Sequence, residues 1–498
     1  MQNLRFCTIL LFGFLGLTFL GNNYPINEID KDIDYIVGIF RILYSLLLIL
    51  KLVGGWKAIP LIAGWENESS VQKYYLIWIL NSIFICFGLF TIFCSTINFL
   101  FCFFIWRKQK EYSVEELLFR LVAFHLIFLN SGKVLSLDEY FAINISIWST
   151  NPISLNLFIL NILLSFFSAG FEKINSSVWR KGLGFYYFVA IPHFVNPKFK
   201  ILKKNLYLCV LLNWLTIIIE LFSFLTLFDS KLNIIFLIGL LLFSISLFII
   251  VDLSYIGQIS TLLMIFLISL NYQNWPGSIF DRVVSFQIEI TYINFLFYFL
   301  WILTIVECLY FKPLSTKFGS WIVTASTALV PLIVFNSVHY FGLYLFRLRG
   351  ENNGNYHAAL NVFNDDGTRG IMQIWKPRNY QNAMYSITDL CIAYIKNIPE
   401  RIKWREPQVI DLCYVAKKEL FEKNIFCSKI YLDVKVLNPS KTFTRDTSNW
   451  LSNNWETIGY TNFERRNPVW IKKGNIPKYT YTKRWPVQNK ITNVSDYR

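Results

Sequence analysis

The chain is 498 residues long, has a mean hydropathy of +0.43 and carries 16% charged residues. An ordinary soluble domain carries about 25% charged residues, so the composition excludes a protein that is soluble over its whole length. Hydrophobic residues make up 54% of the chain and aromatic residues 18%. These values predict an α-helical polytopic membrane protein.

Long apolar runs predict about nine to eleven membrane helices, because a helix needs about 20 residues to cross the hydrocarbon. We expect them near residues 5–20, 35–54, 74–106, 115–131, 153–171, 206–228, 233–251, 255–271, 290–311 and 319–346. The run 74–106 is too long for one ordinary span. It is either two helices with a tight turn near Cys94-Ser95 or one strongly tilted helix.

The first apolar run follows Arg5 and resembles a secretory signal peptide, but no small-residue cleavage site follows it. We interpret it as a retained signal anchor. The loops 107–110 and 180–204 are basic and the loop 21–34 is acidic, so the positive-inside rule places the basic loops in the cytoplasm. If the long run is two helices, the C-terminal region is external. The composition suggests an AT-rich genome, and we expect a bacterial cytoplasmic (inner) membrane.

The chain divides into residues 1–346, which hold the apolar runs, and residues 347–498, which carry 25 Lys and Arg against 14 Asp and Glu. Short runs and turn signals in the second region predict an extramembrane α+β domain. We expect strands in Ala359–Phe363 and Lys429–Val436, helices over Tyr385–Ile398 and Asp411–Asn424, and a hairpin turn at Asp366-Gly367.

A basic domain attracts acidic partners, either anionic lipid headgroups or a carboxylate-rich polypeptide. The alternative is a solvated face that binds nothing specific. Nucleic acid is not expected as a partner, because the chain has no nucleic-acid motif and has a membrane tether.

Lys173 ends one of the apolar runs, within the segment Ser165–Gly182. Removing an amine from water disfavours its charged form, and a neutral amine can accept a proton. A lysine at the edge of hydrocarbon is therefore a candidate functional residue. The alternative is a snorkelling lysine whose ammonium reaches the headgroups.

Motifs of other chemistries are missing from the sequence. The nine cysteines show no disulfide framework, and the four histidines have no spacing typical of zinc or haem ligands, so no metal is expected. There is no dinucleotide-binding, Walker or nucleophile-elbow pattern.

The segment Ala169–Ile174, followed by Trp179 and Gly182, resembles the signature of the vitamin K-dependent γ-glutamyl carboxylase family, whose membrane module is called the HTTM domain. Other segments resemble that family in the same order: Ser136–Asp138, Asn213–Phe222, Ile256-Gly257, Asp366–Gly370, Pro377, Glu406–Gln408 and Phe421. The resemblance covers roughly residues 35–435.

The resemblance implies that Lys173 acts as the base toward a reduced quinone similar to vitamin K hydroquinone. Reaction of the deprotonated quinol with O2 would then give a base strong enough to remove the γ-proton of a peptide glutamate, which CO2 carboxylates. The partners it implies are membrane lipid and a glutamate-containing protein or peptide. A base buried in a dry pocket suits proton transfer near neutral pH.

The sequence departs from the family at two positions. Lys133 stands where the family has a histidine, and the segment Leu247–Asp252 lacks the second family histidine. We therefore expect Lys133 and Lys173 as catalytic candidates, and the two could face one pocket.

Four further residues are candidates for substrate binding: Asp138, His193, Trp179 and Glu220. Each has a structural alternative. Asp138 could pair with a lysine or cap a helix, and Glu220 could form a structural ion pair. His193 could be incidental to its loop, and Trp179 could anchor at the membrane interface.

Three hypotheses follow. The first is a carboxylase-like enzyme that uses reduced quinone, O2 and CO2. The second is a family member with other chemistry, such as quinol epoxidation alone or maturation of an exported peptide. The third is a non-catalytic membrane scaffold that keeps only the fold, because a fold does not dictate a function.

Overall fold

The computed structural model is mostly helical over the residues that it describes. These are 31–56, 59, 64–108, 114–129, 131–141, 152–175, 177–182, 184–190, 199, 201–202, 205–227, 230–250, 254–273, 343–350, 356–363, 369–375, 391–396, 410–411, 413–415, 417–418, 428–437 and 456–474. The expected helices 5–20 and 290–311 lie outside them.

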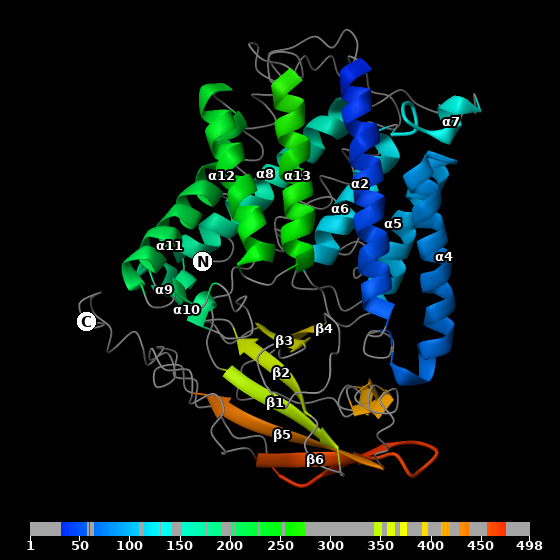
Figure 1. Cartoon of the computed structure of the whole chain (residues 1–498), viewed down its shortest axis with the longest axis vertical. Helices are drawn as coiled ribbons and strands as arrows, with labels where there is room; N and C mark the ends of the chain where they lie inside the picture. The colour runs from blue at the N-terminus through cyan, green and yellow to red at the C-terminus, as the bar shows by residue number, and fades with distance from the viewer. Residues whose placement is uncertain are drawn as a thin grey trace, which may run out of the picture.

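The helices form a bundle in which some run roughly along the long axis of the molecule and others cross it obliquely (Figure 1). The bundle consists of α2 (Lys31–Gly55), η2 (Trp65–Asn67), α4 (Glu68–Phe87), α5 (Thr91–Lys108), α6 (Val114–Phe128), α7 (Leu137–Tyr140), α8 (Pro152–Asn175), α9 (Ser177–Arg180), α10 (Gly184–Ala190), α11 (Leu206–Leu221), η4 (Phe222–Leu227), α12 (Ser230–Ile249) and α13 (Ser254–Gln273). Seven of the ten expected helices thus have counterparts among these elements.

The long run 74–106 is two helices, as one of the two alternatives predicts. The break lies at Gly88, ahead of the expected Cys94-Ser95 position. Gly88 ends α4 in a left-handed conformation (φ 66°), which glycine adopts without strain. A Cβ at this position would lie 2.6 Å from Arg41 Nη1, so the site also requires a residue without a side chain.

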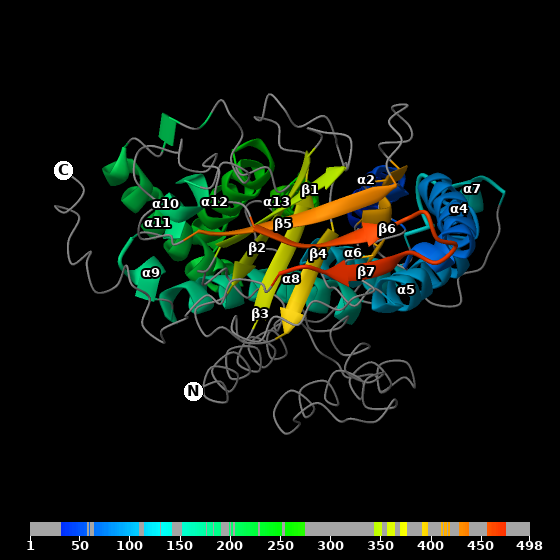
Figure 2. The same cartoon turned by 90° about the horizontal axis from the view of Figure 1, so that it is seen from below.

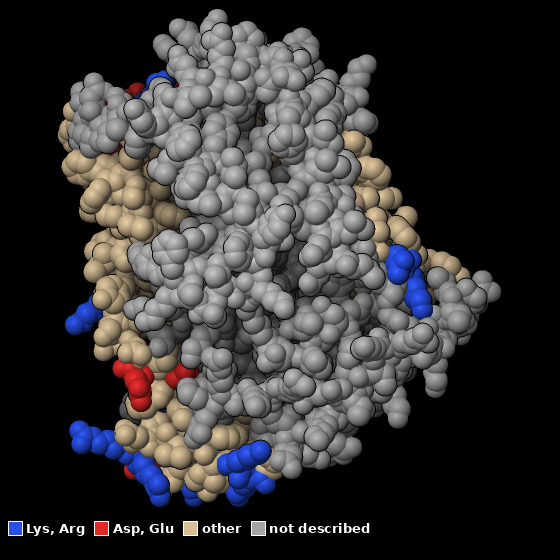
Figure 3. All heavy atoms as spheres, turned by 180° about the vertical axis from the view of Figure 1, so that it is seen from behind, with Lys and Arg blue, Asp and Glu red and all other residues tan. Residues whose placement is uncertain are grey.

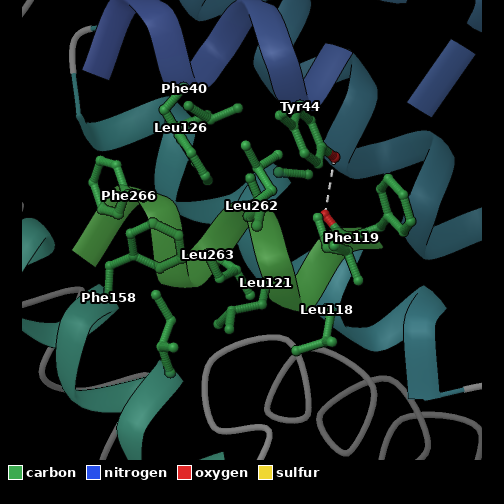
Figure 4. Close-up of a cluster of buried hydrophobic side chains, with 14 of the residues drawn as sticks. Phe40, Tyr44, Leu118, Phe119, Leu121, Leu126, Phe158, Leu262, Leu263 and Phe266 are labelled. Carbon is green, nitrogen blue, oxygen red and sulfur yellow. Dashed lines mark hydrogen bonds between the residues drawn. The ribbon is translucent and has the colours of Figure 1, made fainter. Parts of the chain in front are cut away.

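Apolar side chains from α2, α6, α8 and α13 fill the centre of the bundle (Figure 4). Phe40, Phe158 and Phe266 meet there with ring centroids 4.4–5.8 Å apart. The buried Tyr44 hydroxyl donates to the Phe119 carbonyl at 2.9 Å, which satisfies the polar end of an otherwise apolar ring.

Helix α2 buries several polar side chains beside core residues such as Phe40 and Tyr44, and its exposed face is apolar. Four polar side chains on its inner face are buried: Asp34, Arg41, Ser45 and Lys51. Six large apolar side chains on its outer face are exposed: Tyr35, Ile39, Leu43, Leu46, Leu50 and Val53. A soluble amphipathic helix instead exposes a polar face.

Two helical stretches among the described residues, Ile33–Gly55 and Trp65–Phe87, are long and apolar enough to cross a membrane. Shorter apolar helices accompany them in α5, α6, α8, α11, α12 and α13.

The C-terminal region contains a seven-stranded antiparallel sheet below the bundle, in the order β4-β3-β2-β1-β5-β6-β7 (Figures 1 and 2). Its strands are β1 (Leu343–Gly350), β2 (Tyr356–Phe363), β3 (Arg369–Trp375), β4 (Cys391–Lys396), β5 (Lys429–Leu437), β6 (Glu456–Asn462) and β7 (Val469–Lys472). The strands expected at 359–363 and 429–436 are confirmed. The Asp366-Gly367 turn itself lies outside the described residues, between the paired strands β2 and β3.

Two predicted helices in this region are wrong in part. The segment Tyr385–Ile398 contains strand β4, which pairs with β3. The run 319–346 ends inside β1. The first error concerns a short apolar stretch, whose periodicity does not separate a helix from a strand, so the pairing with β3 decides. The second concerns only the end of a long run, because residues 319–342 lie outside the described residues and 343–346 pair with β2 and β5. The expected helix Asp411–Asn424 is helical where it is described.

This segment, described at residues 410–411, 413–415 and 417–418 and called the 410–418 segment below, joins the bundle to the sheet. Asp411 Oδ1 accepts from Trp65 N at 2.9 Å, and the Tyr414 hydroxyl donates to Glu68 Oε2 at 3.1 Å. Lys418 forms an ion pair with Glu68. Burial raises the pKa of the Cys413 thiol to about 12.

Candidate functional site

Two helices hold a buried lysine opposite a buried glutamate. Lys173 lies in the last turn of α8, and Glu220 lies near the end of α11. The Lys173 Nζ forms an ion pair with Glu220 Oε2, and the two side chains are 10% and 2% exposed. Because so little solvent reaches them, each charge depends on the other for compensation.

A close approach of the two backbones allows this pairing. A Cβ at Gly170, one turn before Lys173, would lie 2.5 Å from Leu221 N and 2.9 Å from the Glu220 carbonyl carbon. Only glycine permits that approach, so Gly170 brings the end of α8 within reach of α11.

Aromatic rings cover the Lys173 amine. The Nζ lies 5.2 Å from the centroid of the Trp179 ring and 5.8 Å from that of Phe243. A ring face attracts a cation within about 6 Å, so both rings favour the charged form of the amine. The interface-anchor alternative for Trp179 is wrong, because this residue is 3% exposed and packs inside the bundle.

Helices α11 and α10 hold Trp179 in place, α11 through its backbone and α10 through its ring. Asn213 Nδ2 donates to the Trp179 carbonyl at 2.9 Å, and Asn213 Oδ1 accepts from Phe185 N at 3.2 Å. A Cβ at Gly184 would lie 2.2 Å from the indole. Asn213 and Gly184 therefore fix where the ring stands relative to Lys173.

The hypothesis of an unpaired amine at Lys173 is wrong in this structure, because Glu220 is its partner. The ion pair with Glu220 and the two ring faces stabilise the ammonium. The sequence singled out both residues, and the structural ion pair weighed for Glu220 is the geometry found. The snorkelling alternative is also wrong, because the amine points into the bundle and not toward solvent.

Lys133 does not share this site. Its Nζ lies 2.6 Å from Asp34 Oδ2 at the start of α2, and its side chain is 52% exposed. It precedes α7, which lies on the opposite side of the bundle from α9, the helix that follows Lys173 (Figure 1). The prediction that Lys133 and Lys173 share a pocket is therefore wrong, because each lysine pairs with a different carboxylate.

Asp138 caps a helix, as one of its two alternatives predicts, but the helix is α5 and not its own. Asp138 Oδ1 accepts from Phe90 N at 2.7 Å, and Oδ2 accepts from Thr91 N and Thr91 Oγ1, each at 2.8 Å. Its own helix, α7, is capped by the Ser136 hydroxyl, which accepts from Glu139 N. With these bonds made, Asp138 acts as a structural residue.

Sequence reasoning missed the buried Arg41. Its Nη1 donates to the Ser131 carbonyl, and its Nη2 donates to the Leu135 carbonyl at 2.5 Å. These two hydrogen bonds hold the 131–138 segment against α2. The arginine inside an apolar run was the available signal. For Phe243, which faces Lys173, the sequence held no signal, because a phenylalanine in an apolar helix is not distinctive.

His193 lies outside the described residues, so its role stays a prediction. Among the residues that are described, no group of three or more His, Cys, Asp and Glu side chains could hold a metal ion.

No protein-family model matches this chain, and neither the curated proteins nor the solved structures contain a match to it. The resemblance to the γ-glutamyl carboxylases therefore rests on the residues named above.

The Lys173–Glu220 arrangement has a definite chemical capacity. The ammonium–carboxylate pair becomes a neutral amine and carboxylic acid when one proton moves along the hydrogen bond. Burial penalises the two charges, whereas the hydrogen bond and the rings favour them. A hydroxyl that reaches the pair could give its proton to Glu220 while the Lys173 ammonium pairs with the resulting oxyanion.

Proposed function

We propose that the chain is an integral membrane enzyme in which the Lys173–Glu220 pair removes a proton from a lipid-soluble aromatic alcohol, a reduced quinone. The observation that carries the proposal is the burial of this pair beneath the Trp179 and Phe243 rings. An ionisable pair inside an apolar bundle is a candidate functional site, because the cost of removing two charges from water can exceed the gain from pairing them.

The membrane assignment is supported by the outer surface of the helices. Exposed apolar residues line α2 over its whole length, and α4 repeats the pattern with Leu76, Ile77, Leu80, Phe84 and Phe87. Lipid would cover these side chains, since water would penalise a continuous apolar surface. We place the protein in a bacterial inner membrane, with the sheet domain on the external side.

In this proposal the two charged residues act together. The phenolic O–H bond breaks, the proton goes to Glu220, and the Lys173 ammonium pairs with the phenolate oxygen. The aromatic faces of Trp179 and Phe243 suit contact with a flat ring. The resemblance supplies the remaining steps: oxygenation of the quinol by O2, and carboxylation of a peptide glutamate by CO2.

The test uses the full chain purified in lipid nanodiscs, with vitamin K hydroquinone, O2, labelled bicarbonate and a glutamate peptide. We expect quinone epoxide and labelled peptide with the native protein, and neither with Lys173→Ala. Lys181→Ala is the matched control, because Lys181 is an exposed lysine close by in the sequence. Epoxide without labelled peptide would restrict the function to quinol oxygenation, consistent with the absence of the two family histidines.

A second candidate function is a non-catalytic membrane scaffold, and the direct contact between Lys173 and Glu220 favours it. Such a pair can serve only to join α8 to α11. If several quinols give no product with the folded protein, and the paired substitution of both residues by apolar ones leaves a stable protein, the scaffold assignment holds.

A further inference from the structure

The side of the sheet that faces away from the bundle carries an apolar and aromatic surface on β5, β6 and β7. Directly paired residues on neighbouring strands point to the same side of a sheet. Tyr431 pairs with Tyr460, and Tyr460 pairs with Ile471. We call the outer face the set Tyr431, Tyr460, Asn462, Val469 and Ile471.

Burial along the strands shows which side is outward. Ile430, Leu432 and Thr461, which alternate with the outer face, are fully buried, and Thr461 interacts with Cys413 of the segment that joins the sheet to the bundle. On the outer face, Val469 is 40% exposed and Ile471 is 37% exposed. The outer face is therefore exposed to solvent at Val469 and Ile471 and partly exposed at its other three residues.

Three cations lie on this surface or in the turn beside it, next to one exposed carboxylate, Glu464. The Lys473 Nζ lies 5.0 Å from the centroid of the Tyr460 ring and 5.9 Å from that of Tyr431, and the two rings lie 5.3 Å apart. Arg465 and Arg466 are exposed at the turn between β6 and β7. Lys and Arg side chains gather at this lower end of the molecule, where grey atoms do not cover them (Figure 3). The surface therefore combines apolar contact area with positive charge.

The edge of the sheet adds backbone groups to this surface. Strand β7 ends the strand order, so its outer edge pairs with none of the described strands. In an antiparallel ladder, alternate residues of an edge strand point their N–H and C=O groups away from the sheet. An extended segment can bind there by adding one strand, with its side chains reaching the flanking face.

We propose that the edge of β7, with the outer face and these three cations, binds an extended acidic segment of another polypeptide. Backbone pairing with β7 would give the segment its register. Apolar side chains of the segment would lie beside Val469 and Ile471, and its carboxylates would meet Lys473 and the two arginines. The inference goes beyond the chemistry proposed for Lys173 and Glu220, because it concerns binding alone.

The position of the surface favours a polypeptide over lipid headgroups. Strands β5 and β6 lie at the end of the molecule away from the helices, and the view from below shows β5, β6 and β7 in front of them (Figures 1 and 2). A bilayer around the bundle would face the other side of the sheet. Its headgroups would therefore not reach the outer face.

The experiment measures binding of a fluorescent twelve-residue peptide of alternating valine and glutamate to the full chain in neutral-lipid nanodiscs. We expect saturable binding that weakens as salt rises, and no binding of the valine–lysine peptide or of a glutamate peptide interrupted by proline, which cannot pair along a strand. Hydrogen exchange should slow at the amides of Val469–Lys472 when the acidic peptide binds.

The variant Arg465→Glu with Arg466→Glu should raise the Kd of the acidic peptide by about tenfold or more. The matched control, Arg180→Glu with Lys181→Glu, makes the same charge change at exposed residues of the bundle and should leave the Kd unchanged. Circular dichroism would verify that both variants are folded.

Four results would overturn the proposal. They are an equal loss of binding in the control variant, equal binding of the lysine peptide, displacement of the peptide by phosphatidylserine vesicles, and no binding at 1 mM peptide, which corresponds to about −4 kcal/mol. An equal loss of binding in the control variant would mean general charge attraction, and equal binding of the lysine peptide would mean nonspecific contact. Displacement by phosphatidylserine vesicles would assign the surface to lipid.

Discussion

Gly170 and Glu220 lie backbone against backbone where α8 crosses α11: a Cβ on the glycine would stand 2.9 Å from the glutamate carbonyl carbon. No rotamer change relieves a clash with backbone, so the helices themselves must move. Such a movement acts on the ion pair, because Lys173 lies one turn further along α8 and Glu220 is part of the contact.

We therefore expect Gly170→Ala to separate the helices and to destabilise the protein by about 1–3 kcal/mol, as overpacking does. Thermal unfolding in nanodiscs would measure the loss. Gly55→Ala is the control, because a Cβ at Gly55 meets nothing within 4 Å. Equal stability of the two variants would show that α8 and α11 do not meet closely at Gly170.

The Lys173–Glu220 pair predicts strongly non-additive substitutions. Lys173→Met alone leaves a buried carboxylate, and Glu220→Leu alone leaves a buried ammonium, so each should cost about 3–5 kcal/mol. The double variant leaves no charge and should cost much less than the sum of the two. A double-mutant cycle on unfolding free energies tests this; additive costs would mean that the two groups do not interact.

The same cycle separates the candidate functions. An enzyme loses its activity in the stable double variant, because no group remains to take the proton. A scaffold has no catalytic activity to lose, so the double variant would differ from the native protein only in stability. Activity and stability must therefore be measured on the same preparations.

The sequence predicted the bundle better than it predicted the sheet. Helices such as α2 and α11 come from apolar runs too long for a strand, so hydropathy alone locates them. Strand β4 is a short apolar stretch with a period typical of neither element, and only its pairing with β3 makes it a strand. Gly88 is a typical helix-end residue, but the apolar run continues on both sides of it, so hydropathy alone did not locate the end of α4 there.

For the site, the sequence identified the groups but not their partners. Lys173 and Glu220 both stand out as charges in apolar runs, yet they are 47 residues apart, and only the crossing of α8 and α11 brings them together. Lys133 and Asp138 were equally good candidates in the sequence. In the structure Lys133 pairs with Asp34, and Asp138 caps the start of α5. The residue type and the position in the sequence could not show which of these charged residues pair with each other and which have structural roles elsewhere.

Asp138 joins two distant segments by capping α5, and its loss should be measurable. Asp138→Ala removes the acceptor for Phe90 N, Thr91 N and Thr91 Oγ1, so we expect a loss of about 1–2 kcal/mol in unfolding free energy. Glu139→Ala is the control, because Glu139 is an exposed carboxylate next in the chain. If both variants unfold at the same temperature as the native protein, the cap contributes nothing.

Tyr414 makes the contact between the bundle and the sheet sensitive to alkaline pH. Burial, and then the Glu68 carboxylate that accepts its hydrogen bond, raise the pKa of Tyr414 above its usual value of 10.0. A raised pKa means that the folded state holds the phenolic proton more tightly than the unfolded state does. The stability from this contact is therefore fully present below pH 10 and is lost as the pH rises through the folded-state pKa.

Substitution by phenylalanine isolates this effect, because Tyr414→Phe keeps the ring against Trp65 and removes only the hydroxyl. We expect the native protein to exceed the variant in unfolding free energy by about 1 kcal/mol at pH 8, since the bond is partly exposed to solvent. That advantage should shrink as the pH rises above the usual tyrosine pKa of 10.0 and the native phenol ionises beside Glu68. Tyr140→Phe, at an exposed tyrosine, should show no such difference at any pH. A native advantage that stayed constant while the phenol of the native protein ionises, followed by its absorbance, would mean that Tyr414 does not donate to Glu68. The contact between α4 and the 410–418 segment would then depend on Asp411 and Lys418.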